Sequence, residues 1–327
     1  MKKDLSIEIL KKCPNLCLHC SSCSDMNAEQ IIEYEKICEL VDGSVKLDVK
    51  RICLSGGEPF LHPDVLKIIA YIKNKDIEVN VYTCGVITKD GLPVGLSKEL
   101  LGEAKKLGLT KLMFNLQSVN ENTYDKIVGV AGNFPKVKES IKRAMECGIN
   151  SEIHFVPMKM NHLEINDVID FAVQNGIECV SFLKLVPHGR ATNNKDKILL
   201  DEKELEFVKN TLYEQKLKGK PIRIGIPLSK SQESEKCHAI HGKLYVKYNG
   251  DVFGCEAFKY LDLPNTSDGI KPDNIYDKDI VEIYYSSLFL KCSRELIKDY
   301  NREISNCETC PVQKYIRKEG NQNVKHY

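Results

Sequence analysis

Three closely spaced cysteines, Cys13, Cys17 and Cys20, form the first group in the chain that could bind a metal. They form a C-x3-C-x2-C pattern directly after an apolar β-type run. Three thiolates on one loop can hold three irons of a [4Fe–4S] cube and leave the fourth iron open to a small molecule, whereas a four-cysteine cluster is closed and suits electron transfer. A zinc site or unpaired thiols are the alternatives that this spacing alone leaves open.

A glycine-rich segment at the end of the next expected strand favours the cluster. Residues 55–59 read Ser-Gly-Gly-Glu-Pro. Gly56 and Gly57 allow a ligand to approach the backbone closely, because glycine has no side chain. The carboxylate of Glu58 and the nearby backbone carbonyls suit the ammonium group of such a ligand.

The combination of CPNLCLHC with SGGEP resembles the radical S-adenosylmethionine (SAM) superfamily, over roughly residues 5–190. The resemblance implies an α/β fold, a partial (βα)6 TIM-like barrel that holds the cluster at its top. It implies that the three cysteines bind a [4Fe–4S] cluster whose open iron chelates the amino and carboxylate groups of SAM. The amino group would be received by the glycine-rich segment, through Gly56, Gly57 and Glu58.

Three more residues match positions that bind SAM in relatives. His19 precedes the third cysteine, where an aromatic residue is common, and either packs near the adenine or is an ordinary loop residue. Ser118 matches the serine of an S-x-D-G segment, with Asn120 at the position of the acid. Arg190 lies in VPHGRA, which resembles a P-x-G-R-A turn, and either helps to hold SAM or substrate or is a structural turn residue.

Cys84 directly follows the third expected strand, in YTCG, where many relatives read T-N-G. The carboxyl ends of barrel strands point toward the active site. The Cys84 thiol is therefore a candidate hydrogen-atom donor to a substrate radical, and the alternative is a small buried cysteine. Cysteines without motif support are interpreted as packing residues: Cys38, Cys53, Cys147, Cys179 and Cys292.

A second cysteine group lies near the C-terminus, at Cys237, Cys255, Cys307 and Cys310. Its first pair reads C-x12-G-x4-C, and its second pair is C-x2-C followed by proline. Zinc fits four thiolates sterically. The pattern, however, resembles the auxiliary-cluster extension called a twitch domain, a shortened relative of the SPASM domain, and the longer SPASM cysteine series does not follow. The resemblance implies one auxiliary [4Fe–4S] cluster with four protein ligands.

Alternating apolar runs and helical patterns set the expected positions of these residues. Expected strands are 5–10, 51–55, 78–83, 111–117, 151–157 and 179–185, and expected helices lie near 27–41, 64–74, 97–107, 134–147 and 163–175. Six βα units in a row favour a parallel sheet or partial barrel. A polar loop over 191–197, a helix over 201–218, a strand at 222–226 and a hairpin around Asn249-Gly250 follow. We therefore expect a core at 1–190, a linker with a bridging helix and strand at 191–236, and an auxiliary-cluster domain, small and of α+β type, at 237–327.

Composition sets further bounds. The formal net charge is +1, which argues against a nucleic-acid partner. No apolar run approaches the roughly 18 residues that span a bilayer, and the N-terminus lacks a signal core. We therefore expect a cytoplasmic protein without a membrane partner. In that reducing compartment, 14 cysteines indicate metal ligation or redox chemistry rather than disulfides.

The resemblance also implies a reaction. A reduced flavodoxin or ferredoxin supplies an electron, SAM is cleaved to methionine and a 5′-deoxyadenosyl radical, and that radical abstracts a substrate hydrogen. Relatives with such extensions often epimerise or crosslink ribosomally made peptides, and this is the favoured function; with twelve residues before Cys13, no leader-recognition domain is expected at the N-terminus. A dehydrogenase or carbon-skeleton enzyme acting on a small molecule is the alternative. A non-catalytic iron–sulfur or zinc protein is a remote third.

Overall fold

The computed structural model describes residues 3–229, 237, 239–259, 269–303, 310 and 312, and its centre is one long curved sheet. The strands of this sheet are β1 (Lys3–Leu10), β2 (Val49–Gly56), β3 (Glu78–Thr83), β6 (Leu109–Asn115), β7 (Asn150–Phe155), β8 (Cys179–Phe182), β9 (Ile222–Ile224), β10 (Lys243–Val246) and β11 (Val252–Phe253). Their spatial order is β11-β10-β1-β2-β3-β6-β7-β8-β9. All neighbours are parallel except β10 and β11.

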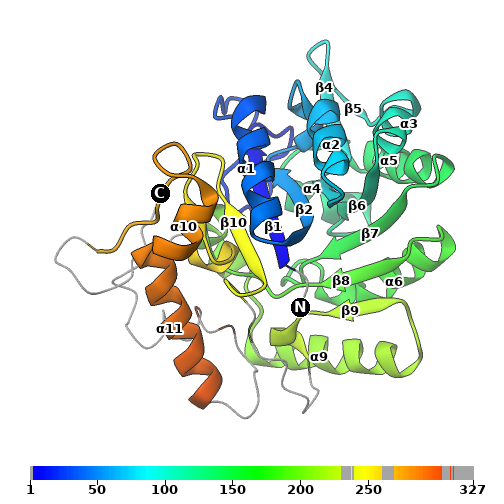
Figure 1. Ribbon diagram of the computed structural model, residues 1–327. Coiled ribbons are helices and arrows are strands. Elements are labelled where there is room, and N and C mark those ends of the chain that lie inside the picture. Colours follow the sequence, from blue (N-terminus) through cyan, green and yellow to red (C-terminus); the bar gives the residue numbers. More distant parts are fainter. Residues whose placement is uncertain are drawn as a thin grey trace.

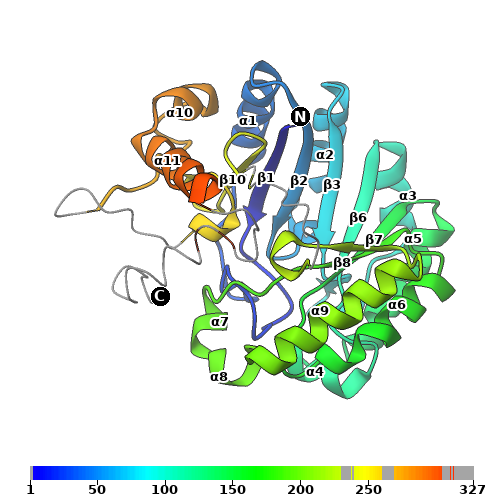
Figure 2. The same cartoon turned by 90° about the horizontal axis from the view of Figure 1, so that it is seen from below.

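Helices cover the outer face of this sheet (Figures 1 and 2). The longer helices are α1 (Tyr34–Lys46), α2 (Val65–Asn74), α3 (Lys98–Lys106), α4 (Glu121–Val128), α5 (Phe134–Glu146), α6 (Ile165–Gln174) and α9 (Glu202–Leu217). Outward side chains of the strands, such as Ile153 and Phe155 on β7, are fully buried and apolar. The α/β fold with a parallel sheet confirms the predicted class, a partial barrel.

Helix α1 begins seven residues later than the expected helix near 27–41. The preceding segment is extended and lies along the end of β1. Ile32 donates its N–H to the carbonyl of Ile9 at 2.9 Å, and Lys11 donates to Gln30 at 2.9 Å. These backbone bonds with a neighbouring segment replace the bonds that a helix would make within itself.

Two further segments differ from the expectation. The sequence predicts a loop over 191–197, but the chain there forms α7 (Arg190–Asn193) and α8 (Lys195–Ile198), which are anchored by the buried side chains of Ala191 and Ile198. A hairpin of β4 (Val86–Lys89) and β5 (Leu92–Gly95), not expected at all, follows β3. Single-turn 3-10 helices are η1 (Pro59–Leu61), η2 (His162–Glu164), η3 (Ile226–Leu228) and η4 (Glu256–Phe258).

The C-terminal region is attached to the barrel through both sheet and helices. The Asn249-Gly250 turn joins β10 to β11 as expected, and Gly250 donates to the carbonyl of Lys247 at 2.8 Å. Beyond it lie α10 (Ile280–Ser286) and α11 (Leu288–Glu303), and α10 packs on α1. The expected division at 190 and 236 stays a prediction, and one sheet runs through all three parts.

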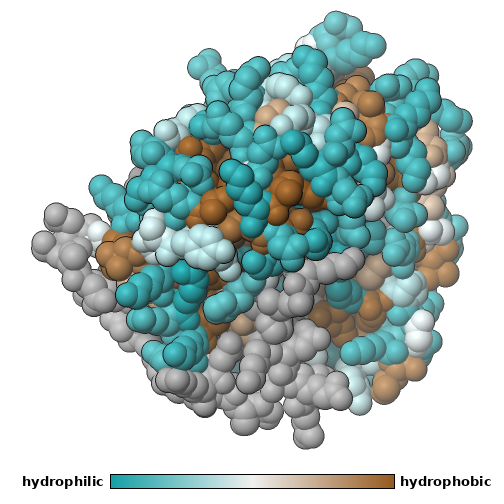
Figure 3. Space-filling model, viewed as in Figure 1, coloured by the Kyte–Doolittle hydropathy of each residue, from teal (hydrophilic) through white to brown (hydrophobic). Residues whose placement is uncertain are grey.

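The outer surface of the protein is consistent with a sheet that is covered by helices. The face shown in Figure 3 is mostly hydrophilic, with apolar side chains in small patches. No helix among the described residues is both long enough and apolar enough to cross a bilayer.

Candidate active site

The first three cysteines lie together on the loop that leaves β1. Cys13 and Cys17 are buried and Cys20 is partly exposed. Cys13 donates its N–H to the carbonyl of Asp25 at 3.0 Å, and Cys20 donates to the carbonyl of Cys17 at 3.1 Å, so the backbone of the loop is fixed. Burial, together with the neighbouring Cys13 and Cys20, raises the pKa of Cys17. Three thiols in one enclosed loop are a donor set that fits three irons of a cube.

The two glycines at the end of β2 bring its backbone against this loop. Gly57 donates to the carbonyl of Leu10, and Glu58 donates to the carbonyl of Lys12, both at 2.8 Å. A Cβ atom on Gly57 would lie 1.9 Å from the Lys12 carbonyl oxygen, and one on Gly56 would lie 2.1 Å from that of Leu10. Gly56 also has a φ of +121°, which other residues rarely adopt. Glycine is therefore required at both positions.

The carboxylate of Glu58 is enclosed within the protein and not exposed at all. It accepts hydrogen bonds from the Thr83 hydroxyl at 2.9 Å, the Cys84 N–H at 2.7 Å and the Phe60 N–H at 3.2 Å. Burial raises the pKa of Glu58 to about 7 in spite of these bonds. The side chain thus joins the ends of β2 and β3, and its predicted contact with the amino group of SAM stays a prediction.

Arg190 lies near the C-terminal end of the barrel core and holds the cysteine loop by hydrogen bonds. Its Nε donates to the carbonyl of Cys17 at 2.9 Å, and its guanidinium NH2 group donates to the carbonyl of Ser24 at 2.8 Å. The preceding Gly189 has a φ of +57°, and a Cβ there would lie 2.4 Å from the Ser21 carbonyl oxygen. These bonds support a structural role for Arg190, and its predicted contact with SAM or substrate stays a prediction.

We expect Arg190→Met to loosen the cysteine loop. Two charged hydrogen bonds to carbonyls are lost, each contributing roughly 1.5–3 kcal/mol, so iron should leave the loop at least about tenfold faster. The measurement is the anaerobic rate of iron transfer to a chelator. Arg143→Met is a matched control, because Arg143 also donates to a carbonyl, that of Leu96 at 2.9 Å, but on an outer helix. Equal rates for the two variants would contradict the assigned role.

His19 and Ser118 lie near the carboxyl ends of the strands. The Nδ1 atom of His19 is buried without a hydrogen-bond partner among the described residues, as expected of a site for a polar ligand. Burial lowers the pKa of His19 to about 4, in spite of a hydrogen bond with Asn115, so its ring is neutral at pH 7. Ser118 is buried and bonds to the Glu164 carboxylate and the carbonyl of Asn120. The predicted contacts of His19 and Ser118 with SAM stay predictions.

The thiol of Cys84 lies against the cysteine loop. Its side chain is buried, and Sγ donates to the carbonyl of Val86 at 3.4 Å. A hydrogen bond with Cys13, together with burial, raises the pKa of Cys84 well above its usual value, so the thiol keeps its proton. The structure thus brings Cys84 beside a residue predicted to bind the cluster, and its role as a hydrogen donor stays a prediction.

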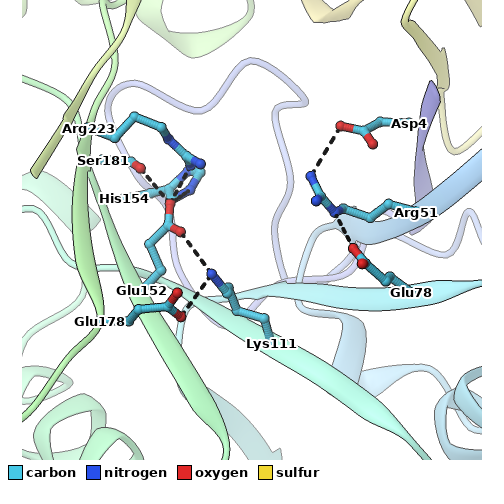
Figure 4. Close-up of polar contacts among 9 residues, drawn as sticks. All are labelled: Asp4, Arg51, Glu78, Lys111, Glu152, His154, Glu178, Ser181 and Arg223. Carbon is cyan, nitrogen blue, oxygen red and sulfur yellow. Dashed lines mark hydrogen bonds and ion pairs between the residues drawn. The ribbon is translucent and has the colours of Figure 1, made fainter. Parts of the chain in front are cut away.

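The inward face of the sheet carries charged networks that sequence analysis missed (Figure 4). Glu152 accepts hydrogen bonds from His154 at 3.1 Å, from Ser181 and from Arg223. Burial alone would raise the pKa of Glu152, but the bonds from His154 and Ser181 and the charge of Arg223 lower it to about 2. A second network joins Arg51 to Asp4 and Glu78. The alternation of polar and apolar residues along β7 is a signal from which this inward face could have been predicted.

Three cysteines of the second group lie among the described residues. Cys237, Cys255 and Cys310 are partly buried, and Cys307 lies outside the described residues. Burial raises the pKa of Cys255 to about 12, and the nearby Cys310 and Cys237 add to this rise, while Lys243 opposes it. In the described part of the chain, no three Cys, His, Asp or Glu side chains converge as a single metal ion requires. The shared surroundings of Cys237, Cys255 and Cys310 fit the predicted auxiliary site.

Comparison with protein families identifies the class. Residues 7–173 match the model of the radical SAM superfamily, and residues 237–311 match that of an iron-sulfur cluster-binding domain, SPASM. The chain therefore belongs to the radical SAM superfamily and carries a C-terminal SPASM domain. Membership of this superfamily makes it an enzyme that uses iron–sulfur clusters and SAM.

Its curated relatives act on different substrates. The chain is 27% identical over 215 residues to a probable GTP 3′,8-cyclase of Sulfurisphaera tokodaii, covering 65% of this chain and 64% of that one. It is 23% identical over 218 residues to the PqqA peptide cyclase of Granulibacter bethesdensis, covering 66% and 56%. The chain thus spans about three fifths of the length of these relatives.

Solved structures share the fold over more of the chain. SuiB of Streptococcus suis bound to S-adenosylmethionine superposes with a TM-score of 0.71 and 18% identity, covering 90% of this chain and 68% of that one. The anSMEcpe enzyme with bound AdoMet superposes with a TM-score of 0.67 and 16% identity, covering 94% and 88%. At these identities the likeness shows the fold alone.

Proposed function

We propose that this enzyme modifies a ribosomally made peptide by radical chemistry. The observation that carries the proposal is that the fold of SuiB, also solved with its precursor peptide SuiA, extends over 90% of this chain. One curated relative is moreover a peptide cyclase.

In this proposal each group of residues has a defined task. Cys13, Cys17 and Cys20 hold the cluster that, with SAM, supplies a 5′-deoxyadenosyl radical. Gly56 and Gly57 present backbone to the amino group of SAM. The inward networks around Glu152 offer fixed charges and hydrogen-bond donors to a polar substrate that enters the barrel.

The second cysteine group defines the remaining tasks. Cys237, Cys255, Cys307 and Cys310 hold an auxiliary [4Fe–4S] cluster, which takes up or delivers an electron. A flavodoxin or ferredoxin is the proposed reductant. For epimerisation, a thiol returns a hydrogen atom to the substrate radical, with Cys84 as the first candidate, and the thiyl radical regains a proton from solvent and an electron through the auxiliary cluster. For crosslinking, the substrate loses one hydrogen atom to the 5′-deoxyadenosyl radical and a second hydrogen as a proton, and the auxiliary cluster accepts the remaining electron.

The test is anaerobic turnover with SAM in heavy water, using the short peptide encoded nearest to the gene, followed by mass spectrometry. A product with one added non-exchangeable deuterium supports epimerisation, and a product lacking two hydrogens supports crosslinking or oxidation. An unchanged peptide with SAM still cleaved would overturn the peptide proposal. GTP is then the next substrate to test, because several relatives carry the name of GTP cyclases.

If epimerisation is found, we expect Cys84→Ala to prevent deuterium incorporation while SAM is still cleaved, because the thiol that quenches the substrate radical is lost. Cys38→Ala is the control, since Cys38 lies on the outer helix α1. The measured quantity is the fraction of peptide that carries deuterium. Full incorporation by Cys84→Ala would assign the donor to another thiol.

A further inference from the structure

A lysine of the C-terminal region is buried against the loop that carries the first cysteine group. The Nζ atom of Lys259 lies 2.5 Å from Glu8 Oε1, 2.7 Å from Ser22 Oγ and 3.2 Å from Ser21 Oγ. The side chains of Lys259 and Glu8 are 1% and 3% exposed. An ammonium group has three N–H donors, so each of them has an acceptor here. The lysine thus connects β1, the cysteine loop and the C-terminal region at one point.

The carboxylate of Glu8 is held from several sides. It also accepts hydrogen bonds from the Ser22 hydroxyl and from the Tyr248 N–H, the latter at 3.4 Å. The Tyr245 ring on β10 lies 5.0 Å from Lys259 Nζ and covers the ammonium group. Burial alone would raise the pKa of Glu8, but the charge and hydrogen bond of Lys259 lower it below its usual value. The Glu8 carboxylate is therefore held as an anion in an enclosed site beside Lys259.

A second contact joins the same two regions. The Nε2 atom of His188 lies 3.0 Å from the carbonyl oxygen of Ala257, which follows Cys255 by two residues. His188 directly precedes Gly189 and Arg190, which contact the backbone of the same cysteine loop at Ser21 and Cys17. Segment 255–259 therefore makes two contacts. Lys259 contacts the cysteine loop, and Ala257 contacts His188 in the turn that holds this loop.

A buried ion pair has a particular energetic effect. It adds little stability over well-packed apolar side chains, but separating its partners leaves an uncompensated buried charge, which is strongly unfavourable. Positions of segment 255–259 that separate Lys259 from Glu8 are therefore higher in free energy than the docked position. This position also fixes Ser21 and Ser22, which directly follow Cys20 on the loop.

We propose that Lys259 and Glu8 are positioning residues that couple the auxiliary-cluster segment to the geometry of the SAM-binding cysteine loop. Through this pair, docking of segment 255–259 holds Ser21 and Ser22, and with them the end of the loop at Cys20. The inference rests on the radical SAM chemistry of the family and not on the identity of the substrate.

The first test is Lys259→Met in the anaerobically reconstituted full chain. The dissociation constant for SAM should rise at least about tenfold, and the change that SAM produces in the EPR signal of the reduced cluster should weaken. Lys278→Met is the matched control, because the Lys278–Asp273 pair, 2.7 Å apart, lies at the surface of the same region. Unchanged SAM affinity and EPR response in a cooperatively melting Lys259→Met protein would overturn the proposal.

A double-mutant cycle separates coupling from a general loss of stability. Glu8→Gln keeps shape and an acceptor, and it replaces Lys259→Met as the test variant if the latter does not melt cooperatively. Each single change should weaken SAM binding, and the Glu8→Gln, Lys259→Met double variant should bind SAM little worse than either, since both act on one pair. Fully additive effects would contradict the coupling. No peptide takes part in either measurement, so the result is independent of the proposed function.

Discussion

Replacing Cys13 by alanine is expected to abolish reductive cleavage of SAM. Two thiolates cannot hold three irons of the cube, so the cluster with the open iron should not assemble. If both sites hold the same type of cluster, about half of the iron should be lost, while the auxiliary site keeps its share. The measurements are iron and sulfide content after anaerobic reconstitution and the yield of 5′-deoxyadenosine with dithionite.

The control for this change is Cys147→Ala. Cys147 lies at the end of the outer helix α5, where its thiol bonds to the carbonyl of Lys98 and its side chain packs at the edge of the core. Iron content and 5′-deoxyadenosine yield should remain as in the wild type. A Cys13→Ala protein with full iron content and normal SAM cleavage would show that Cys13 is not a ligand.

Gly57→Ala is expected to separate the end of β2 from the cysteine loop. The added Cβ would lie 1.9 Å from the carbonyl oxygen of Lys12, and this neighbour is backbone, which cannot rotate away. The two hydrogen bonds of Gly57 and Glu58 to the loop should be lost. We expect a destabilisation of roughly 4 kcal/mol or more and a large loss of SAM affinity.

Gly102→Ala provides the opposite expectation within the same chain. Gly102 lies inside α3, and a Cβ there meets no atom within 4 Å. Alanine is favoured over glycine in helices, so this variant should be more stable by roughly 0.5–1 kcal/mol. Thermal unfolding and SAM titration of both variants test these two expectations. A Gly57→Ala protein that melts and binds SAM like the Gly102→Ala protein would refute the steric argument.

Much of the fold could be predicted because its signals are local. Buried parallel strands alternate with helices, and each strand of the core lies within a few residues of its expected position. The start of α1 could not be predicted, because residues 30–32 bond to the end of β1 instead of forming a helical turn. The inward networks were missed for a related reason: Glu152 and His154 are ordinary polar residues until β8 and β9 bring Ser181 and Arg223 beside them.

The candidate site divides in the same way. The cysteine loop and the glycine pair have fixed spacings, so their residues could be named from the sequence. The residues that hold the loop in place could not be named in this way. Arg190 contacts Cys17 across 173 positions of the chain, and Lys259 contacts Glu8 across 251. Nothing in the local sequence of Arg190 or Lys259 indicates which distant carbonyl or carboxylate it meets.

The pairing of β1 with β10 bears on how the molecule is made. Asp4 lies opposite Lys243, so one side of β1 stays an open strand edge until the ribosome has produced almost 240 further residues. At synthesis rates of about 5–20 residues per second, this takes roughly 12–50 s. Once β2 has been made, the cysteine loop has this neighbour but not yet its C-terminal cover. Open strand edges favour aggregation. The order of synthesis therefore leaves an interval in which the loop with the first cysteine group has been made and its C-terminal cover has not.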